Sequence, residues 1–192
     1  MLRLASKSAA RRAMLEAAGV PFEVVDAPYY EEQAKLRFGE LSPPELALAL
    51  AEGKALSASG DGLVLGSDQT LERDDGTMLS KPASRGDAFR QLKSLSGRAH
   101  QLHSAAVIAE SGGAIWRHVE SVSLTMRPLS DDFLGSYLDA EYEAIRWSVG
   151  GYRIEGPGVQ LFDRIEGSHF AILGLPLLPL LGYLRARGVL PS

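Results

Sequence analysis

The chain has 192 residues, 45% of them hydrophobic, and can bury one substantial core or two closely joined lobes. Its formal net charge of -4 argues against broad electrostatic binding to nucleic acid or anionic membranes, so a bound anion needs a local cluster of cations. The absence of cysteine excludes disulfides, thiol catalysis and cysteine metal sites, and it fits a reducing compartment. No signal-peptide pattern is visible, and the leucine-rich run at 171–184 is too short and too interrupted by proline to span a membrane. We therefore expect a cytoplasmic protein with no nucleic-acid and no membrane partner.

The first predicted elements form a corner between a strand and a helix. Residues 2–5 predict a short buried strand, and residues 9–18 predict a helix. Ser8 can cap this helix, whose free N–H groups and positive dipole end attract an anion. Arg11 and Arg12 add planar guanidinium groups that match phosphate oxygens. The corner is either a phosphate site or an ordinary capped helix with two solvated arginines.

The remaining elements alternate between strands and helices, which favours an α/β fold with a mixed central sheet. In chain order we expect strands at 22–25 and 63–66 around a helix at 43–57, a helix at 84–96, a long hairpin of 101–110 and 114–126, a helix at 130–141, and a terminal helix within 171–184. The polar stretch 26–40 is predicted to be a mobile loop, and Asp74-Asp75-Gly76 a hairpin turn. Because no linker divides the sequence, we expect a single domain over residues 1–192.

Polar residues follow the apolar strand predicted at 63–66. Ligands commonly bind at the carboxyl ends of strands in open α/β sheets, and Asp68 there could bind Mg²⁺ or accept a proton from water. A turn-forming aspartate bonded to nearby backbone is the alternative. Lys81 follows within one hairpin length and Lys54 lies on the preceding helix, so both ammonium groups could reach this point, although a lysine on a helix is usually a solvated surface charge.

Two further carboxylates are candidates for chemistry. Glu31, in the predicted loop, could share a hard cation with Asp68, although acidic loop residues are usually solvated. Glu155 lies among glycines and could accept hydrogen bonds from the N–H edge of a guanine-type base, or could belong to a surface turn. Zinc-site histidine spacing, a Walker pattern, a nucleophile elbow and a dinucleotide fingerprint are all absent, which argues against kinase and dehydrogenase functions.

These features occur together in a recognisable order along nearly the whole chain. The motifs are Ser6-Lys7-Ser8 with Arg11-Arg12, Glu31, Lys54-Ala55, Gly66-Ser67-Asp68-Gln69, Lys81-Pro82, Leu95-Ser96-Gly97, Gly151-Tyr152-Arg153-Ile154-Glu155-Gly156, Glu166-Gly167 and Leu173-Gly174-Leu175-Pro176. The set resembles the Maf family of nucleotide pyrophosphatases. The resemblance implies a Maf/ITPase-like α/β fold with an elongated mixed sheet and two lobes around an active-site cleft. It also implies hydrolysis of a nucleoside triphosphate to a monophosphate and pyrophosphate, and it allows a homodimer.

The resemblance also implies roles for individual residues. Asp68 would accept a proton from the attacking water and would bind a divalent metal, expected to be Mg²⁺, together with Glu31. The residues expected to bind the substrate and its phosphates are Ser6, Ser8, Arg11, Arg12, Glu31, Lys54 and Lys81. The residues expected to select the base are Ala10, Gln69 and Glu155.

Within the family, Gly66-Ser67-Asp68-Gln69 and Glu155 are similar to the branch that acts on 7-methyl-GTP. The dTTP/UTP branch typically carries Ala-Asp-Thr and a glutamine at these places. Ala10 departs from the arginine of the dTTP/UTP branch and from the larger residue of some 7-methyl-GTP members, and Tyr30 stands where an aspartate often precedes the glutamate. Two alternatives to a 7-methyl-GTP enzyme stay open: a dTTP/UTP-type pyrophosphatase, and a nucleotide-sensing regulator of cell division without turnover.

Overall fold

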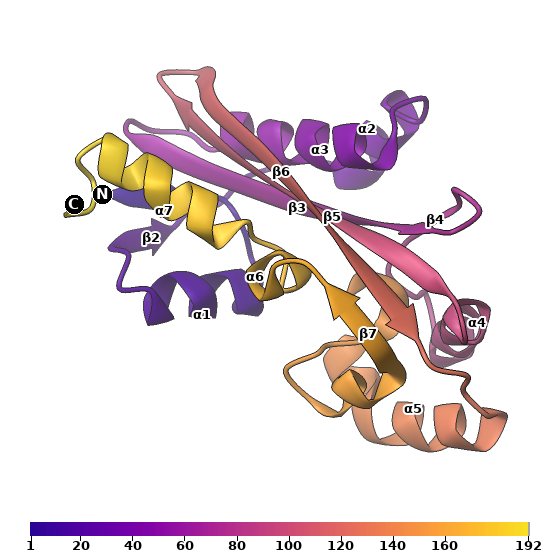
Figure 1. Cartoon of the computed structure of the whole chain (residues 1–192). Coiled ribbons are helices and arrows are strands. Elements are labelled where there is room, and N and C mark those ends of the chain that lie inside the picture. The colour runs from indigo at the N-terminus through magenta and orange to yellow at the C-terminus, as the bar shows by residue number, and fades with distance from the viewer. Residues whose placement is uncertain (192) are drawn as a thin grey trace. The chain divides into compact units, whose positions relative to one another are not determined.

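The computed structural model describes residues 1–191, without the side chain of Glu32, as two compact units (Figure 1). Unit 1 comprises residues 1–69, 103–120 and the chain from 168 onward, and unit 2 comprises 70–102 and 121–167. The single domain expected over residues 1–192 stays a prediction.

Within the described residues, the strands form a seven-stranded sheet of order β2-β1-β3-β5-β6-β7, with β4 paired to β3. The strands are β1 (Leu2–Leu4), β2 (Phe22–Val24), β3 (Leu63–Arg73), β4 (Met78–Leu79), β5 (Ala99–Glu110), β6 (Gly113–Met126) and β7 (Phe162–Glu166). The helices are α1 (Ala9–Ala17), α2 (Glu31–Arg37), α3 (Pro43–Ser57), α4 (Arg85–Leu95), α5 (Asp131–Ile145), α6 (His169–Ile172) and α7 (Leu177–Ala186), with 3-10 turns at Val149–Gly151 and Pro157–Leu161. β1 pairs in parallel with β2 and β3, whereas β3–β4 and β6–β7 are antiparallel, so the predicted mixed α/β fold is confirmed.

In unit 1 the alternation of β3 side chains separates two cores. Leu63 and Leu65 belong to a leucine-rich cluster that includes buried residues of α1 and α7. Val64 points to the opposite face, into a cluster that α3 supplies with alanines. Figure 1 accordingly draws α3 on one side of these strands and α1 and α7 on the other. The small alanine side chains let α3 come close to β3, which matters for the site described below.

Unit 2 has its own packing around two helices and an aromatic cluster. The helices α4 and α5 contact each other, and each begins at a serine whose hydroxyl accepts a backbone N–H of the first turn, Ser84 and Ser130. The His100 ring lies 5.6 Å from the Tyr152 ring, and Tyr152 meets Phe162 edge to face at 4.9 Å. His100, which is 1% exposed, is thus a structural core residue of this unit.

Two predictions of local structure are wrong. Residues 26–40 contain the helix α2 in place of a mobile loop: Glu31 and Lys35 pair at 2.9 Å one turn apart, and Ala34 is buried with residues of α3. Helix formation in this polar stretch therefore depends on a neighbouring helix that local composition does not reveal.

The second error concerns the strand predicted at 63–66. β3 continues to Arg73, so Asp68 lies within the strand and not at its carboxyl end. The polar pair at 67–68 does not stop the strand because the Ser67 hydroxyl donates to the carbonyl oxygens of Ala105 and Gly174 inside unit 1, at 2.8 and 2.9 Å. β7 is not predicted from the sequence at all.

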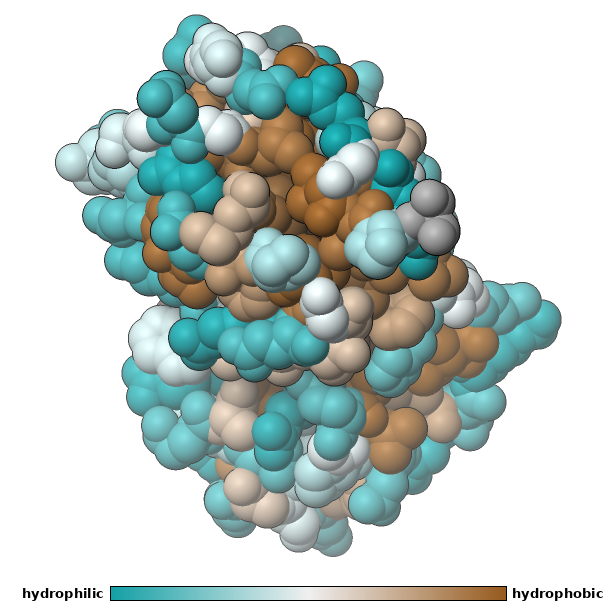
Figure 2. Space-filling view, turned by 90° about the vertical axis from the view of Figure 1, so that its left-hand side faces the viewer, coloured by the Kyte–Doolittle hydropathy of each residue, from teal (hydrophilic) through white to brown (hydrophobic). Residues whose placement is uncertain are grey.

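The surface carries scattered apolar side chains. Figure 2 looks onto the side on which Figure 1 draws α1, β2 and α7, and brown, apolar residues are visible there among hydrophilic ones. Val24 of β2 and Leu178 of α7 are exposed. No helix among residues 1–191 has the length and apolar character needed to cross a membrane. The cytoplasmic location and the homodimer stay predictions.

Candidate active site

Two carboxylates and one ammonium group meet inside unit 1. Lys54 Nζ lies 3.0 Å from Glu31 Oε2 and 3.2 Å from Asp68 Oδ2. The Asp68 side chain is 10% exposed, and its buried Oδ2 makes the ion pair with Lys54 without the angle of a hydrogen bond. Its Oδ1 accepts the backbone N–H of Gln69 at 2.8 Å. Three of the residues singled out from the sequence, from three different elements, thus lie together.

The close approach of α3 to β3 brings Lys54 to Asp68. A Cβ on Gly66 would lie 2.1 Å from the carbonyl oxygen of Ala51 and 2.6 Å from the amide nitrogen of Ala55, both on α3. Only glycine leaves room for helix backbone at this distance from a strand. Gly66 is therefore the residue that sets the distance between the lysine-bearing helix and the aspartate-bearing strand.

The corner after β1 supplies one buried cation. Arg11 Nε donates to the carbonyl oxygen of Gly174 at 2.8 Å, and Nη1 donates to Ser6 Oγ at 3.3 Å. Burial lowers the pKa of the Arg11 guanidinium, and the charges of Asp68 and Glu31 oppose this shift. Arg11 therefore lies within electrostatic range of both carboxylates.

The other polar residues of this corner differ in exposure. Ser8 caps α1 and accepts the backbone N–H of Arg11 at 3.4 Å. Ala10 is half-buried on α1, and Arg12 is exposed. The two arginines of this corner therefore differ: Arg11 is part of the interior, and Arg12 faces solvent.

Gln69 is tied to the C-terminal segment. Its amide nitrogen donates to Ser104 Oγ at 2.8 Å and to the carbonyl oxygens of Ala171 and Ile172 at 3.0 and 3.1 Å. This amide therefore joins β3 to the end of α6, and its role in base selection stays a prediction.

Sequence reasoning missed Gly174 and Ser104 as site residues. The Gly174 carbonyl accepts from both Arg11 and Ser67, and Gly174 itself has a positive φ of 96°. The available signal was the motif Leu173-Gly174-Leu175-Pro176, in which a glycine and a proline mark a turn. No comparable local signal points to Ser104.

The remaining predicted site residues belong to unit 2. Lys81 and Glu155 are both exposed there, Lys81 after β4 and Glu155 between the two 3-10 turns. Unit 1 contains the other predicted site residues, Ser6, Ser8, Ala10, Arg11, Arg12, Glu31, Lys54, Asp68 and Gln69.

Glu31 and Asp68 are the candidate ligands for a hard cation. No group of three or more histidine or carboxylate residues in the described part of the chain is arranged to hold a metal ion. Glu31 and Asp68 nevertheless place one carboxylate oxygen each within 3.2 Å of a single point, the Lys54 ammonium. Mg²⁺ is usually bound by one or two carboxylates together with substrate phosphates and water, and this pair suits that role.

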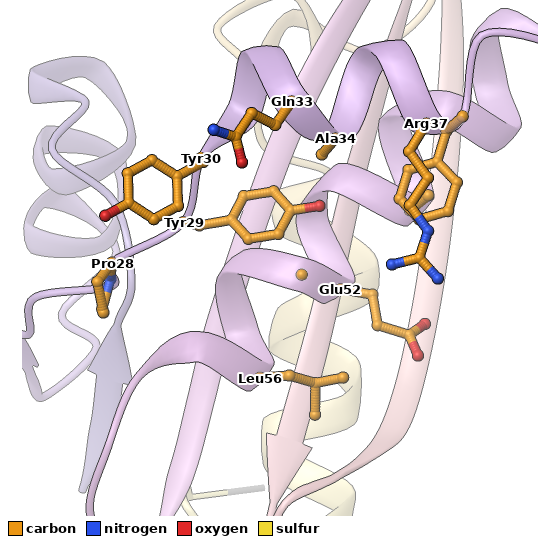
Figure 3. Close-up of a pocket in the computed structure, with 11 residues that line it drawn as sticks. Pro28, Tyr29, Tyr30, Gln33, Ala34, Arg37, Glu52 and Leu56 are labelled. Carbon is orange, nitrogen blue, oxygen red and sulfur yellow. The ribbon is translucent and has the colours of Figure 1, made fainter.

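A pocket of about 630 Å³ lies between α2, α3 and the segment before α2 (Figure 3). Its lining includes Pro28, Tyr29, Tyr30, Gln33, Ala34, Arg37, Phe38, Glu52, Gly53 and Leu56. The Tyr29 ring covers Gly53 so closely that a Cβ there would lie 2.2 Å from it. Burial raises the pKa of Tyr29, and the charges of Asp68 and Glu31 raise it further, while the charge of Arg37 opposes this shift.

Known proteins resemble this chain over its whole length. The sequence matches the family described as Maf-like protein over residues 1–187. It is 48% identical to a nucleoside triphosphate pyrophosphatase of Sphingopyxis alaskensis, over 100% of this chain and 99% of the relative. It is 46% identical to a 7-methyl-GTP pyrophosphatase of Rhizobium meliloti, over 100% of this chain and 98% of that relative. The chain belongs to the Maf family.

Proposed function

We propose that this protein is a nucleoside triphosphate pyrophosphatase, a hydrolase that acts on a phosphoanhydride, and that its preferred substrate is 7-methyl-GTP. The observation that carries the proposal is the meeting of Asp68, Glu31 and Lys54 in a chain whose full-length relatives bear the name of this activity. The intact carboxylate pair argues for turnover over nucleotide sensing alone.

Asp68 is the proposed general base. Water attacks the phosphorus beside the sugar, Asp68 takes the proton of that water, and pyrophosphate leaves with the electrons of the broken P–O bond. Lys54 holds the Asp68 and Glu31 carboxylates in place before substrate binds, at 3.2 and 3.0 Å. Arg11 and Ser6 lie within hydrogen-bond distance of each other and are proposed to contact phosphate oxygens, as are Ser8, Arg12 and Lys81.

The proposed metal is Mg²⁺, which Asp68 and Glu31 would hold. When bound, it would screen the negative charge of the triphosphate. The carboxylates themselves are already gathered by Lys54, so the protein needs no large rearrangement of α2 or β3 to present them.

The base assignment depends on fewer residues. A carboxylate at Glu155 would attract the positive charge of a 7-methylated guanine and accept hydrogen bonds from its N–H edge. The 7-methyl-GTP name of one relative supports this assignment, whereas other relatives carry only the broader name.

The test is release of pyrophosphate from 7-methyl-GTP, GTP, dTTP, UTP and CTP with Mg²⁺. Asp68→Asn should lower kcat by about 100-fold or more, as expected for loss of a general base, and should change nucleotide affinity little. Asp61→Asn, an exposed aspartate of the same unit, is the matched control. Preference for dTTP or UTP would keep the mechanism and refute the base assignment. Tight binding without release from any nucleotide would favour the sensor.

A further inference from the structure

A partly buried ion pair joins α5 to the segment that carries Glu155. Glu141, on the inner face of α5, is 8% exposed and accepts a hydrogen bond from Arg153 Nε at 2.9 Å. A buried carboxylate without a partner would be costly, so Arg153 is firmly required at this place. The reaction proposed above uses neither residue.

Two glycines leave the space that Arg153 needs to lie against α5. A Cβ on Gly156 would lie 3.0 Å from Arg153 Nε and 3.3 Å from its Cζ. A Cβ on Gly158 would lie 2.5 Å from the Arg153 carbonyl oxygen and 3.0 Å from Tyr137 Oη. The chain thus folds back over the arginine at 156–158, and a side chain at either glycine would displace it.

The Arg153 guanidinium also lies against the segment that carries the carboxylate proposed to bind the base, since a Cβ on Gly156, the next residue after Glu155, would lie 3.0 Å from Arg153 Nε. The hydrogen bond to Glu141 raises the pKa of the Arg153 guanidinium, and the charges of Glu141 and then of Glu155, two residues along the chain, add to this shift. Two carboxylates, one on α5 and one exposed, therefore compete for one cation. If Arg153 paired with Glu155, it would occupy the group that a cationic base needs.

We propose that Glu141 is a positioning residue for base selection: by holding Arg153 on α5, it leaves the Glu155 carboxylate available to a positively charged, guanine-type base. This inference rests on the proposed function, because it assumes that Glu155 contacts the base. It adds a residue whose effect on selectivity is exerted through another side chain.

The experiment measures the ratio of kcat/KM for 7-methyl-GTP to kcat/KM for GTP. Glu141→Gln releases Arg153 and should lower this ratio about fivefold, the order of one partly exposed ion pair, through a higher KM for 7-methyl-GTP. The double variant Glu141→Gln/Arg153→Gln removes the competing cation as well, and the ratio should return to within about twofold of the wild-type value.

Two further variants separate positioning from folding. Gly156→Ala pushes the guanidinium off its place while Glu141 stays, and it should lower the ratio in the same direction; this variant decides the question if Glu141→Gln fails to fold. Glu143→Gln removes an exposed ion pair with Arg146 on the same helix and should leave the ratio unchanged.

The outcomes distinguish this inference from the proposed function. An unchanged ratio in Glu141→Gln and Gly156→Ala, or a lowered ratio that the double variant does not restore, would overturn the positioning role and leave the 7-methyl-GTP assignment standing. Glu155→Gln is the reference, since it should lower the ratio at least as far as Glu141→Gln. A wild-type protein without preference for 7-methyl-GTP would overturn the base assignment itself and this inference with it.

Discussion

Gly66→Ala should damage both stability and turnover through a single contact. The new Cβ would lie 2.1 Å from the Ala51 carbonyl oxygen, and ordinary van der Waals contact begins at 3.4 Å. Because the opposing atoms belong to helix backbone, no side-chain rotation relieves the clash. The helix α3 must therefore move away from β3 by about 1.3 Å.

That displacement reaches the candidate site. Lys54 lies on the same face of α3 as Ala51 and Ala55, and its Nζ is 3.2 Å from Asp68 Oδ2. A shift of this size would lengthen the pair to about 4.5 Å, beyond ion-pair distance, and overpacking of this kind costs about 2–3 kcal/mol of unfolding free energy. We expect a lower urea midpoint with unchanged m-value and a kcat at least tenfold below wild type.

The matched control is Gly182→Ala in α7, where a Cβ meets nothing within 4 Å. Alanine there should leave stability unchanged or raise it by up to about 1 kcal/mol, since glycine is unfavourable inside a helix. Urea unfolding and pyrophosphate release of both variants test the reasoning. If Gly66→Ala has wild-type stability and turnover, the distance between α3 and β3 does not set the Lys54–Asp68 geometry.

Three other changes have defined outcomes. Burial lowers the pKa of His100 from the usual 6.5 to about 4. The stability that neutral His100 contributes, about 3 kcal/mol, is therefore fully present above pH 6.5 and is lost as the pH falls to 4. His100→Gln should flatten the dependence of the urea midpoint on pH between these two values. Lys54→Met removes the cation shared by two carboxylates and should lower kcat about 100-fold or more in the pyrophosphate assay. Arg117→Ala removes a largely exposed pair with Glu52 and should change stability by less than about 1 kcal/mol, with turnover unchanged.

The elements that the sequence predicts well carry their own local signals. The helix at 43–57 begins with Ser42 and a proline, and the structure shows the complete capping box with Glu45. The hairpin of β5 and β6 turns at Ser111-Gly112-Gly113, where both a serine and a glycine adopt positive φ. Such boundaries depend on a few adjacent residues and are therefore readable without tertiary contacts.

The errors have the opposite character. α2 depends on contact with α3, and the continuation of β3 through Ser67 and Asp68 depends on acceptors and cations from other elements. A polar pair in a strand looks like a strand end until its partners are known. The same partners that extend the strand also bury Asp68. The burial of Asp68 in the candidate site and the wrongly predicted end of β3 therefore have one physical cause.

The positions of Arg11 and Arg12 around the axis of α1 explain why one is buried and the other is exposed. Arg11 shares a face of α1 with Met14 and Leu15, three and four residues later, and both of these lie in the core of unit 1. Arg12 is rotated by about 100° from Arg11 and faces solvent. The spacing thus agrees with the burial of Arg11, which the sequence analysis did not distinguish from Arg12. Its acceptor, the carbonyl of Gly174, lies 163 residues away and carries no local signal toward α1. A buried guanidinium is tolerated only where such acceptors and nearby carboxylates exist. The spacing of residues along α1 indicates which arginine needs a partner, whereas the partner itself is known only from the fold.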